Sequence, residues 1–179
     1  MNDKYQATLI FITGGARSGK SNYAQQQASA LSANPVYVAT AKVYANDEDF
    51  KQRVQRHIAD RDKNWTTIEE QLYVSKLSLE NKVVVIDCVT LWLTNFFSLY
   101  KCDTYQSLQA IKNEIDALQN ISATFLVISN EIGMGVHAET ETGRRFTDLQ
   151  GWANQYIASK ANKVVLMISG IPVTIKDKQ

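Results

Sequence analysis

The residues with the clearest capacity for chemistry are Gly14-Gly15-Ala16-Arg17-Ser18-Gly19-Lys20-Ser21, near the beginning of the chain. They match the spacing GxxxxGK[ST] in full. In this pattern glycines permit a tight turn whose backbone N–H groups point at phosphate oxygens, the lysine reaches the β- and γ-phosphates, and the serine hydroxyl binds Mg²⁺. An apolar run, Leu9–Thr13, precedes the motif and a helix-forming run, Asn22–Leu31, follows it. This context favours a nucleotide-binding P-loop over a chance glycine-rich turn.

A second candidate for the phosphate site is Asp87, which closes the apolar run Val83-Val84-Val85-Ile86. A metal ion at a P-loop needs a carboxylate from the end of a second buried strand. Because Asp87 has that place in the pattern, we expect Ser21 and Asp87 to hold Mg²⁺ together. A helix N-cap is the other interpretation, in which Asp87 or Thr90 begins a helix over Leu91–Leu99.

The sequence contains two histidines, His57 and His137. His57 lies in a polar segment, and three arginines lie close to it: Arg53, Arg56 and Arg61. Cationic neighbours lower the pKa of an imidazole and keep it neutral, as a nucleophile requires, and arginines also bind phosphate. On the local sequence alone, an exposed histidine on a surface helix is the more ordinary interpretation. Neither histidine has the spacing of a zinc site, and His137 is expected in a loop.

The elements that must position these residues alternate along the chain. Short apolar runs rich in β-branched residues predict strands covered on both faces: Ala7–Thr13, Pro35–Thr40, Lys82–Cys88, Ala123–Ser129 and Lys163–Ser169, with Ile171–Lys176 as a further strand. Segments of helical length lie between them: Lys20–Ala33, Asp47–Asp62, Thr104–Gln119 and Thr147–Ala161. Such alternation implies βαβ units and a mostly parallel sheet. We predict an α/β chain with a single-domain, three-layer P-loop (RecA-like) fold over residues 1–179.

The composition excludes several classes of protein. Lys and Arg number 19 against 18 Asp and Glu, a net charge of +1, so no overall field draws the chain to nucleic acid or an anionic membrane. The chain is 45% hydrophobic, which excludes intrinsic disorder. No run approaches the roughly 20 apolar residues of a membrane span, and Leu9–Ile12 is too short for a signal peptide, so we expect a cytoplasmic protein. Cys88 and Cys102 form no CxxC motif and are expected to pack as free thiols.

Further motifs follow the P-loop in order along the chain. They are Tyr37-Val38-Ala39-Thr40-Ala41; Arg53-Val54-Gln55-Arg56-His57 with Trp65 and Glu69; Asp87-Cys88-Val89-Thr90-Leu91-Trp92-Leu93-Thr94-Asn95; Ser129-Asn130-Glu131-Ile132-Gly133-Met134-Gly135; Arg144-Arg145-Phe146 with Asp148, Gly151 and Asn154-Gln155; and Ser169-Gly170-Ile171-Pro172 with Lys176. Together they resemble the bifunctional adenosylcobinamide kinase / adenosylcobinamide-phosphate guanylyltransferase family of cobalamin biosynthesis. The resemblance runs from about Leu9 to Lys176.

The resemblance implies an enzyme that phosphorylates adenosylcobinamide with ATP or GTP and then transfers GMP from GTP to the phosphate formed. It implies His57 as the residue that carries GMP, and Lys20 as the second catalytic residue. The implied nucleotide contacts are Gly14 to Ser21, Thr40, Ala41, Lys42, Arg61, Glu69 and Asp87. The implied partners are the corrinoid substrate and its phosphate, and the implied assembly is a homotrimer.

Two other functions stay open at this point. A P-loop kinase for a small molecule, without nucleotidyl transfer, would not need His57. A nucleotide-responsive binding protein would hold GTP for a partner to read, but the chain lacks an NKxD guanine-binding motif and Asn130-Glu131 does not fit one. The aromatic residues Trp92, Phe96 and Phe97 are expected in the core or at an interface, with the core the more usual place.

Overall fold

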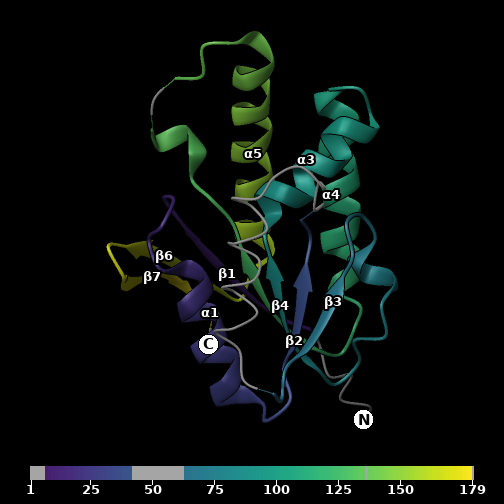
Figure 1. Ribbon diagram of the computed structural model, residues 1–179, viewed down its shortest axis with the longest axis vertical. Coiled ribbons are helices and arrows are strands. Elements are labelled where there is room, and N and C mark those ends of the chain that lie inside the picture. Colours follow the sequence, from purple (N-terminus) through teal and green to yellow (C-terminus); the bar gives the residue numbers. More distant parts are fainter. Residues whose placement is uncertain (1–6, 42–62, 136, 179) are drawn as a thin grey trace.

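The computed structural model of the chain describes residues 7–41, 63–135 and 137–178. These residues form a seven-stranded sheet with the order β3-β2-β4-β5-β1-β6-β7 (Figure 1). The strands are β1 Thr8–Gly14, β2 Val36–Ala39, β3 Thr66–Glu69, β4 Val83–Asp87, β5 Thr124–Ile128, β6 Lys163–Ile168 and β7 Ile171–Asp177. Neighbouring strands are parallel except for β6 and β7, which pair antiparallel. The mostly parallel sheet that the alternating pattern predicts is confirmed.

Helices cover both faces of the sheet and make three layers. Helix α1 (Lys20–Leu31) packs on one face, against β1, β4 and β5. On the other face lie α3 (Val89–Leu99), α4 (Thr104–Leu118) and α5 (Glu141–Lys160) (Figure 1). Successive residues of β1 serve the two faces, since Phe11 belongs to the core under α3, α4 and α5, and Ile12 to the core under α1. Burial on both faces explains why the strands read as apolar runs rather than as alternations.

Local sequence signals fix where the helices begin. Gly19, with φ of 93°, precedes α1 in the left-handed conformation, which a residue without Cβ adopts readily. The Asp103 side chain accepts a 2.9 Å hydrogen bond from the Gln106 backbone N–H at the start of α4. The Thr140 hydroxyl accepts one of 3.1 Å from the Gly143 N–H at the start of α5. These side-chain caps satisfy backbone donors that a first helical turn leaves free.

Two elements differ from the sequence-based prediction. The structure has an additional strand, β3, whose four residues are half-buried or exposed at the edge of the sheet. A short, polar edge strand gives no apolar run to detect. Helix α5 begins at Glu141 rather than at Thr147. Gly143, Arg144 and Arg145 in its first turns interrupt the apolar spacing by which a helix is recognised in a sequence. The hydrogen bond accepted by the Thr140 hydroxyl stabilises the earlier start. The predicted helix over Asp47–Asp62 lies outside the described residues.

The aromatic residues of α3 lie in the core, as expected. Trp92 and Phe96 are at most 1% exposed and Phe97 is also buried. The Trp92 indole N–H donates a 2.8 Å hydrogen bond to the Leu72 carbonyl, and Phe97 packs against Phe146 of α5 with ring centroids 5.5 Å apart. Helix α3 therefore joins the β3–β4 connection to α5 through buried side chains.

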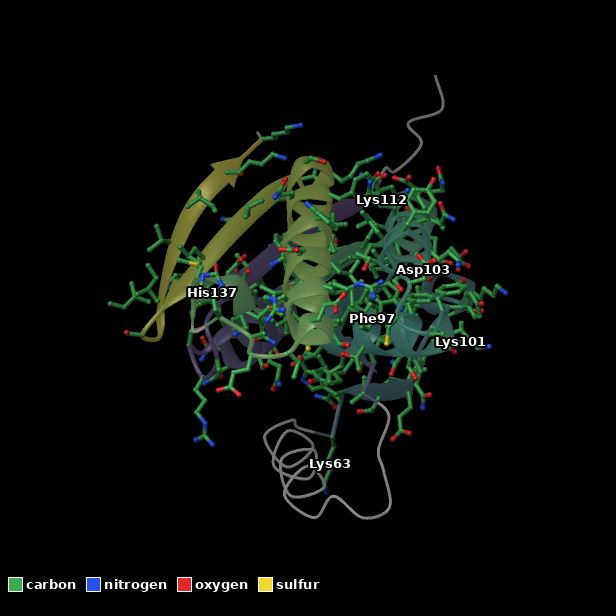
Figure 2. The ribbon with its side chains drawn as sticks, turned by 90° about the horizontal axis from the view of Figure 1, so that it is seen from above. Lys63, Phe97, Lys101, Asp103, Lys112 and His137 are labelled. Carbon is green, nitrogen blue, oxygen red and sulfur yellow. The ribbon has the colours of Figure 1, made fainter. Side chains whose placement is uncertain are left out.

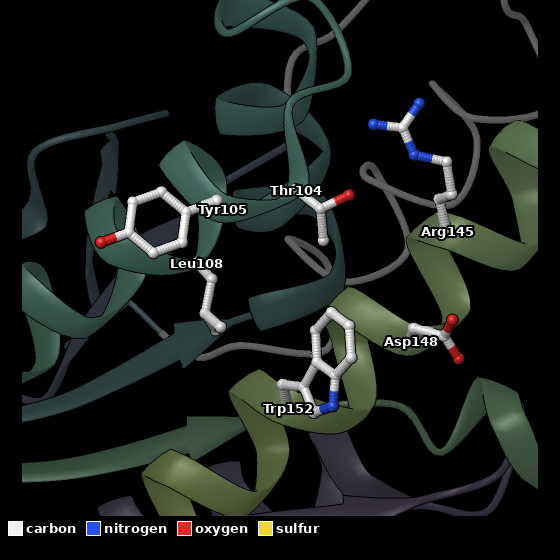
Figure 3. Close-up of a pocket in the computed structure, with 6 residues that line it drawn as sticks. All are labelled: Thr104, Tyr105, Leu108, Arg145, Asp148 and Trp152. Atoms are coloured by element: carbon white, nitrogen blue, oxygen red, sulfur yellow. The ribbon is translucent and has the colours of Figure 1, made fainter.

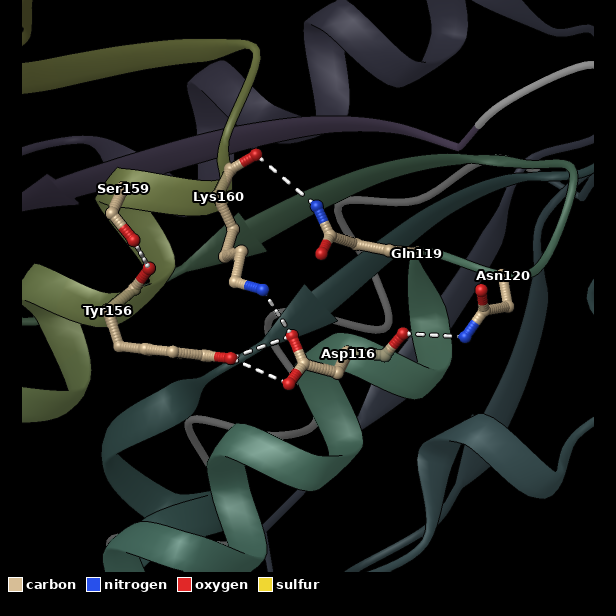
Figure 4. Close-up of polar contacts among 6 residues, drawn as sticks. All are labelled: Asp116, Gln119, Asn120, Tyr156, Ser159 and Lys160. Atoms are coloured by element: carbon tan, nitrogen blue, oxygen red, sulfur yellow. Dashed lines mark hydrogen bonds and ion pairs between the residues drawn. The ribbon is translucent and has the colours of Figure 1, made fainter.

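A polar cluster links the ends of α4 and α5 (Figure 4). The Asp116 carboxylate accepts hydrogen bonds of 2.7 and 2.6 Å from the Tyr156 hydroxyl and forms a 2.7 Å ion pair with Lys160. The Gln119 amide donates weakly, at 3.4 Å, to the Lys160 carbonyl. The cluster fixes the packing of the two helices at the end away from the Thr140 cap. Within the described residues, no helix combines the length and the apolarity needed to cross a membrane.

Candidate active site

The P-loop connects β1 to α1, as its spacing predicts. Its backbone is held against the turn between β6 and β7, where the Gly170 N–H donates a 3.0 Å hydrogen bond to the Ser18 carbonyl. At Gly14, a Cβ would lie 2.5 Å from the Met167 carbonyl oxygen, and φ is +150°. Only glycine fits so close to a neighbouring backbone without displacing it.

Lys20 is buried at the first position of α1, with 7% of its surface exposed. Its ammonium group donates to the Gly15 carbonyl at 2.5 Å and more weakly to Ser18 Oγ at 3.4 Å. Burial lowers the pKa of Lys20, and the negative charges of Asp87 and Glu131 oppose that change. A buried cation surrounded by the loop it belongs to is positioned to bind phosphate oxygens in place of the Gly15 carbonyl.

Asp87 lies at the carboxyl end of β4 and contacts the P-loop directly. Its Oδ2 accepts a 2.7 Å hydrogen bond from the Ser21 hydroxyl and a 2.8 Å bond from the Tyr37 hydroxyl. Helix α3 begins after Cys88 with no side-chain cap, so the N-cap interpretation of Asp87 and Thr90 is wrong. The sequence analysis assigned no role to Tyr37, because a tyrosine inside a buried strand gives only a weak indication that its hydroxyl contacts a functional residue.

The carboxyl end of β2 lies beside Asp87. The Thr40 N–H donates to the Asp87 carbonyl at 3.2 Å, and its hydroxyl donates to the Cys88 carbonyl at 2.8 Å. The Asn95 amide bridges the carbonyls of Thr40 and Gln71 at 2.7 and 2.9 Å. The candidates Thr40 and Ala41 are therefore buried next to the metal candidate and held from α3.

Of the remaining candidates from the sequence, Glu69 is described by the structure and three others are not. Glu69 ends β3, is exposed, and pairs in register with Ala39, whose other neighbour in register is Asp87. It therefore reaches the same edge of the sheet from the far side of β2. The candidates His57, Lys42 and Arg61 lie outside the described residues.

Cys88 packs as a free thiol, as predicted. It is 7% exposed, and burial, followed by the negative charge of Asp87, raises the pKa of its thiol to about 12. A thiol with so high a pKa stays protonated at neutral pH and is a poor nucleophile. Cys102 is a half-buried free thiol at the turn before α4.

A polar cluster behind the P-loop was not found by sequence reasoning. It follows β5 and is completed by α5, and its members are Thr13, Ser129, Glu131, Gln150 and Asn154. The Glu131 carboxylate accepts hydrogen bonds from the Thr13 hydroxyl at 2.5 Å and the Asn154 amide at 3.1 Å. Apart from Glu131, these residues are at most 5% exposed. The available signal was the position of Glu131 three residues after the end of a buried strand.

His137 is exposed in the segment before α5. It lies on the side of α5 that carries β6 and β7, whereas Phe97 lies on the side of α3 and α4 (Figure 2).

A separate hollow of about 450 Å³ lies between α4 and α5, lined by Thr104, Tyr105, Leu108, Arg145, Asp148 and Trp152 (Figure 3). No P-loop residue lines it, so the hollow is distinct from the phosphate site.

The fold and the convergence of Lys20, Ser21 and Asp87 define a P-loop nucleotide-binding protein. Two solved structures share the fold. The first, a prototypical ATPase from the type III secretion system of pathogenic bacteria, has a TM-score of 0.59 and 9% identity over 93% of this chain and 56% of its own. The second, a Pyrococcus horikoshii OT3 protein, has a TM-score of 0.58 and 8% identity over 96% of this chain and 87% of its own.

The chain belongs to the cobinamide kinase / cobinamide phosphate guanyltransferase family, whose sequence model matches residues 10–175. Two relatives are named bifunctional adenosylcobalamin biosynthesis proteins, CobU of Escherichia coli K12 and CobP of Pseudomonas aeruginosa PAO1. CobU is 36% identical over 94% of this chain and 99% of its own length, and CobP is 35% identical over 92% and 95%. The chain is thus an enzyme of a bifunctional family, as the resemblance implies.

Proposed function

We propose that this chain phosphorylates the aminopropanol hydroxyl of adenosylcobinamide with ATP or GTP. It then transfers GMP from GTP to that phosphate, giving adenosyl-GDP-cobinamide and pyrophosphate. The observation that carries the proposal is the convergence of Lys20, Ser21 and Asp87 at the carboxyl ends of β1 and β4 in a chain of this family. Both reactions consume a nucleoside triphosphate, and we propose that one P-loop serves both.

The nucleotide phosphates bind the backbone N–H groups of the P-loop and the Lys20 ammonium in this scheme. These groups stabilise the negative charge that develops as a phosphoryl or nucleotidyl group is transferred. The proposed contacts are Gly14, Gly15, Ala16, Arg17, Ser18, Gly19, Lys20, Ser21, Thr40, Ala41, Lys42, Arg61, Glu69 and Asp87. The burial of Thr40 beside Asp87 and the approach of Glu69 to the same sheet edge support the described part of this set.

The residues present fit a magnesium ion. Mg²⁺ prefers oxygen ligands and is commonly bound by one or two protein groups together with substrate phosphates and water. Ser21 and Asp87 supply a hydroxyl and a carboxylate whose oxygens lie 2.7 Å apart. In the described parts of the chain, no group of three His, Cys, Asp or Glu side chains forms a separate metal cluster. Bound at Ser21 and Asp87, Mg²⁺ would neutralise charge on the triphosphate.

Guanylyl transfer would proceed through His57. A neutral imidazole nitrogen attacks the α-phosphorus of GTP, a nitrogen–phosphorus bond forms, and the bond to the pyrophosphate oxygen breaks. An oxygen of the cobinamide phosphate then attacks the same phosphorus and releases the imidazole. A covalent intermediate divides one displacement into two, so the configuration at the α-phosphorus is retained overall. The support for His57 is its arginine-rich sequence context and the family resemblance.

We further propose that the chain acts as one domain, residues 1–179, in a cytoplasmic homotrimer. The family resemblance supports the trimer, and light scattering on the purified protein would measure it. A mass near 60 kDa, three times the 20.1 kDa of one chain, is the expected result.

The experiment that tests the transfer is incubation with Mg²⁺ and α-³²P-labelled GTP without corrinoid, followed by denaturation. We expect acid-labile, base-stable label on the wild-type protein and on His137→Ala, but none on His57→Ala. His137→Ala is the matched control, because it removes the other histidine of the chain. No label on a folded wild-type protein that binds GTP would favour a kinase without nucleotidyl transfer. Label on His57→Ala would make another residue the nucleophile.

A further inference from the structure

Glu131 occupies a distinctive place in the sheet. Strand β5 lies between β1, which leads into the P-loop, and β4, which ends at Asp87. Three residues beyond the last residue of β5, the Glu131 N–H donates a 3.1 Å hydrogen bond to the carbonyl of Gly14, the first residue of the P-loop. Its backbone is therefore fixed to the loop that binds phosphate.

The carboxylate of Glu131 is held by one oxygen. Its Oε1 accepts the hydrogen bonds from Thr13 and Asn154, at 2.5 and 3.1 Å. Its Oε2 accepts no hydrogen bond from the described residues. The side chain is half-buried. One oxygen thus fixes the orientation, and the other is left with its lone pairs available.

Buried residues fix the donor that orients Glu131. The Asn154 amide donates to both Glu131 Oε1 and the Asn130 carbonyl, each at 3.1 Å. The side-chain Oδ1 of Asn154 accepts from the Ser129 hydroxyl at 2.7 Å and from the Gln150 amide at 3.0 Å, which sets the direction of the Asn154 amide. Such a network, buried and largely satisfied, holds a side chain in one conformation.

We propose that Glu131 is the general base of the kinase reaction, which accepts the proton of the corrinoid hydroxyl through Oε2. The inference rests on the proposed function, since it requires phosphoryl transfer at this P-loop. The hydroxyl oxygen forms a bond to the γ-phosphorus, and the bond from that phosphorus to the β–γ bridging oxygen breaks. The nucleoside diphosphate leaves with the electron pair. The proton passes to Glu131 and then to water.

The other candidate bases near the P-loop are already engaged. Asp87 Oδ2 accepts bonds from Ser21 and Tyr37, and the carboxylate is assigned to the metal ion. The Cys88 thiol is protonated at neutral pH because burial raises its pKa. Glu69 lies at the end of β3, beyond β2 and farther along the sheet from the P-loop strand. Asp87 and Glu131 both lie next to the P-loop and each accepts hydrogen bonds at one oxygen, but Asp87 is assigned to the metal ion, so Glu131 is the described carboxylate left for the proton.

The test measures corrinoid phosphorylation and guanylyl labelling of the protein separately in the variant Glu131→Gln. A glutamine keeps an oxygen to accept from Thr13 and Asn154, while an amide that cannot take up a proton replaces Oε2. We expect the kcat for phosphorylation of adenosylcobinamide to fall about 100-fold or more, since general base catalysis typically contributes 10²–10⁴. Labelling of the protein by α-³²P-GTP, which needs no base for a corrinoid hydroxyl, should stay within threefold of wild type. Glu139→Gln, an exposed carboxylate on the following segment, is the matched control.

Two further measurements keep the proposal falsifiable. Thr13→Val removes one bond to Oε1 but retains the carboxylate, so its kcat should fall much less than that of Glu131→Gln. A kcat within threefold of wild type in Glu131→Gln overturns the proposal, and so does an equal loss of phosphorylation and labelling. A wild-type protein that phosphorylates no corrinoid would instead refute the proposed kinase function, before any variant is made.

Discussion

The Ser21 hydroxyl and the Asp87 carboxylate, 66 positions apart in the sequence, meet across a 2.7 Å hydrogen bond. The contact exists because β4 and the P-loop strand end at the same edge of a parallel sheet, where ligands bind in open α/β folds. The Tyr37 hydroxyl donates to the same Asp87 oxygen and fixes its orientation. These two hydrogen bonds hold the carboxylate in one orientation at the proposed metal site, and a ligand that is already oriented loses less entropy on binding.

Asp87→Asn tests the metal assignment. The amide has nearly the same shape and keeps an oxygen for Ser21 and Tyr37, but it loses the charge that attracts a divalent cation. We expect the Mg²⁺ concentration that gives half-maximal kinase rate to rise about 10- to 100-fold, as for other changes around metal sites. A magnesium titration of the initial rate measures it. Asp177→Asn, at a surface ion pair with Lys163, should leave the titration unchanged, and an unchanged titration in Asp87→Asn would exclude Asp87 from the metal site.

Lys20→Ala tests whether one loop serves both reactions. The Lys20 ammonium bonds only to P-loop groups, Gly15 and Ser18, among the described residues, so its removal should leave the fold intact. We expect phosphorylation and protein labelling both to fall more than 100-fold, because each relies on the same cation to stabilise phosphate charge. Lys82→Ala, an exposed lysine before β4, is the control. Guanylyl transfer near the wild-type rate in a folded Lys20→Ala protein would require a second nucleotide site.

The sequence allowed the P-loop, the parallel sheet and the position of Asp87 at the end of a buried strand to be predicted, because each depends on local pattern. A glycine-rich spacing between a strand and a helix specifies the loop, and an acid that ends an apolar run marks the second strand. Glu131 was named within a motif but was given no role, for a physical reason. Its significance comes from neighbours far away in sequence, Thr13 and Asn154, at separations of 118 and 23 positions.

Edge elements escaped prediction for another reason. Among the described strands, β3 pairs with β2 alone, and it leaves most of its side chains exposed, so no burial pattern marks it. The hydrogen bond from Tyr37 to Asp87 could not be predicted for the same reason as the contacts of Glu131, because it depends on β2 lying next to β4 in the sheet. Sheet order is set by the packing of whole elements, which a single sequence does not display.

Asp116 should make the packing of α4 and α5 sensitive to acid. Burial alone would raise the pKa of Asp116, but hydrogen bonds from Lys160 and Tyr156, with the charges of Lys160 and Lys112, lower it below its ordinary value. A depressed pKa in the folded state means that the carboxylate stabilises the protein above the pKa of the unfolded chain, about 3.9, and that this contribution is lost as the pH falls through the folded value.

Asp116→Asn should therefore cost under about 1 kcal/mol at pH 7, since the pair is half-exposed and screened by water. The difference from wild type should shrink as the pH falls below about 4, because the unfolded chain then takes up a proton at Asp116 that the folded carboxylate, with its lower pKa, does not. Urea unfolding at pH 7, 5 and 3.5 measures the free energy of unfolding for both proteins. A constant difference over this range would contradict the assigned role of the charge.

Trp92→Ala should strongly destabilise the fold. The side chain is 0% exposed, and its indole N–H satisfies the Leu72 carbonyl at 2.8 Å. Truncating a buried tryptophan costs about 3–5 kcal/mol through lost burial and the cavity left behind, and the unpaired carbonyl adds to this. Trp152→Ala, with 48% of the side chain exposed beside the hollow between α4 and α5, should cost about 1 kcal/mol or less.

Chemical unfolding of both tryptophan variants measures the contrast, and Trp92→Phe separates its two causes. Phenylalanine retains much of the apolar volume but leaves the Leu72 carbonyl without its donor, so an intermediate loss of stability is expected. Trp92 joins α3 to the segment after β3. The Asn95 amide, on the same helix, donates to the carbonyls of Thr40 and Gln71. If Trp92→Phe shifts α3, these two carbonyls are displaced, so we expect this variant also to bind nucleotide more weakly. Equal losses for Trp92→Ala and Trp152→Ala would show that α3 does not anchor this side of the site.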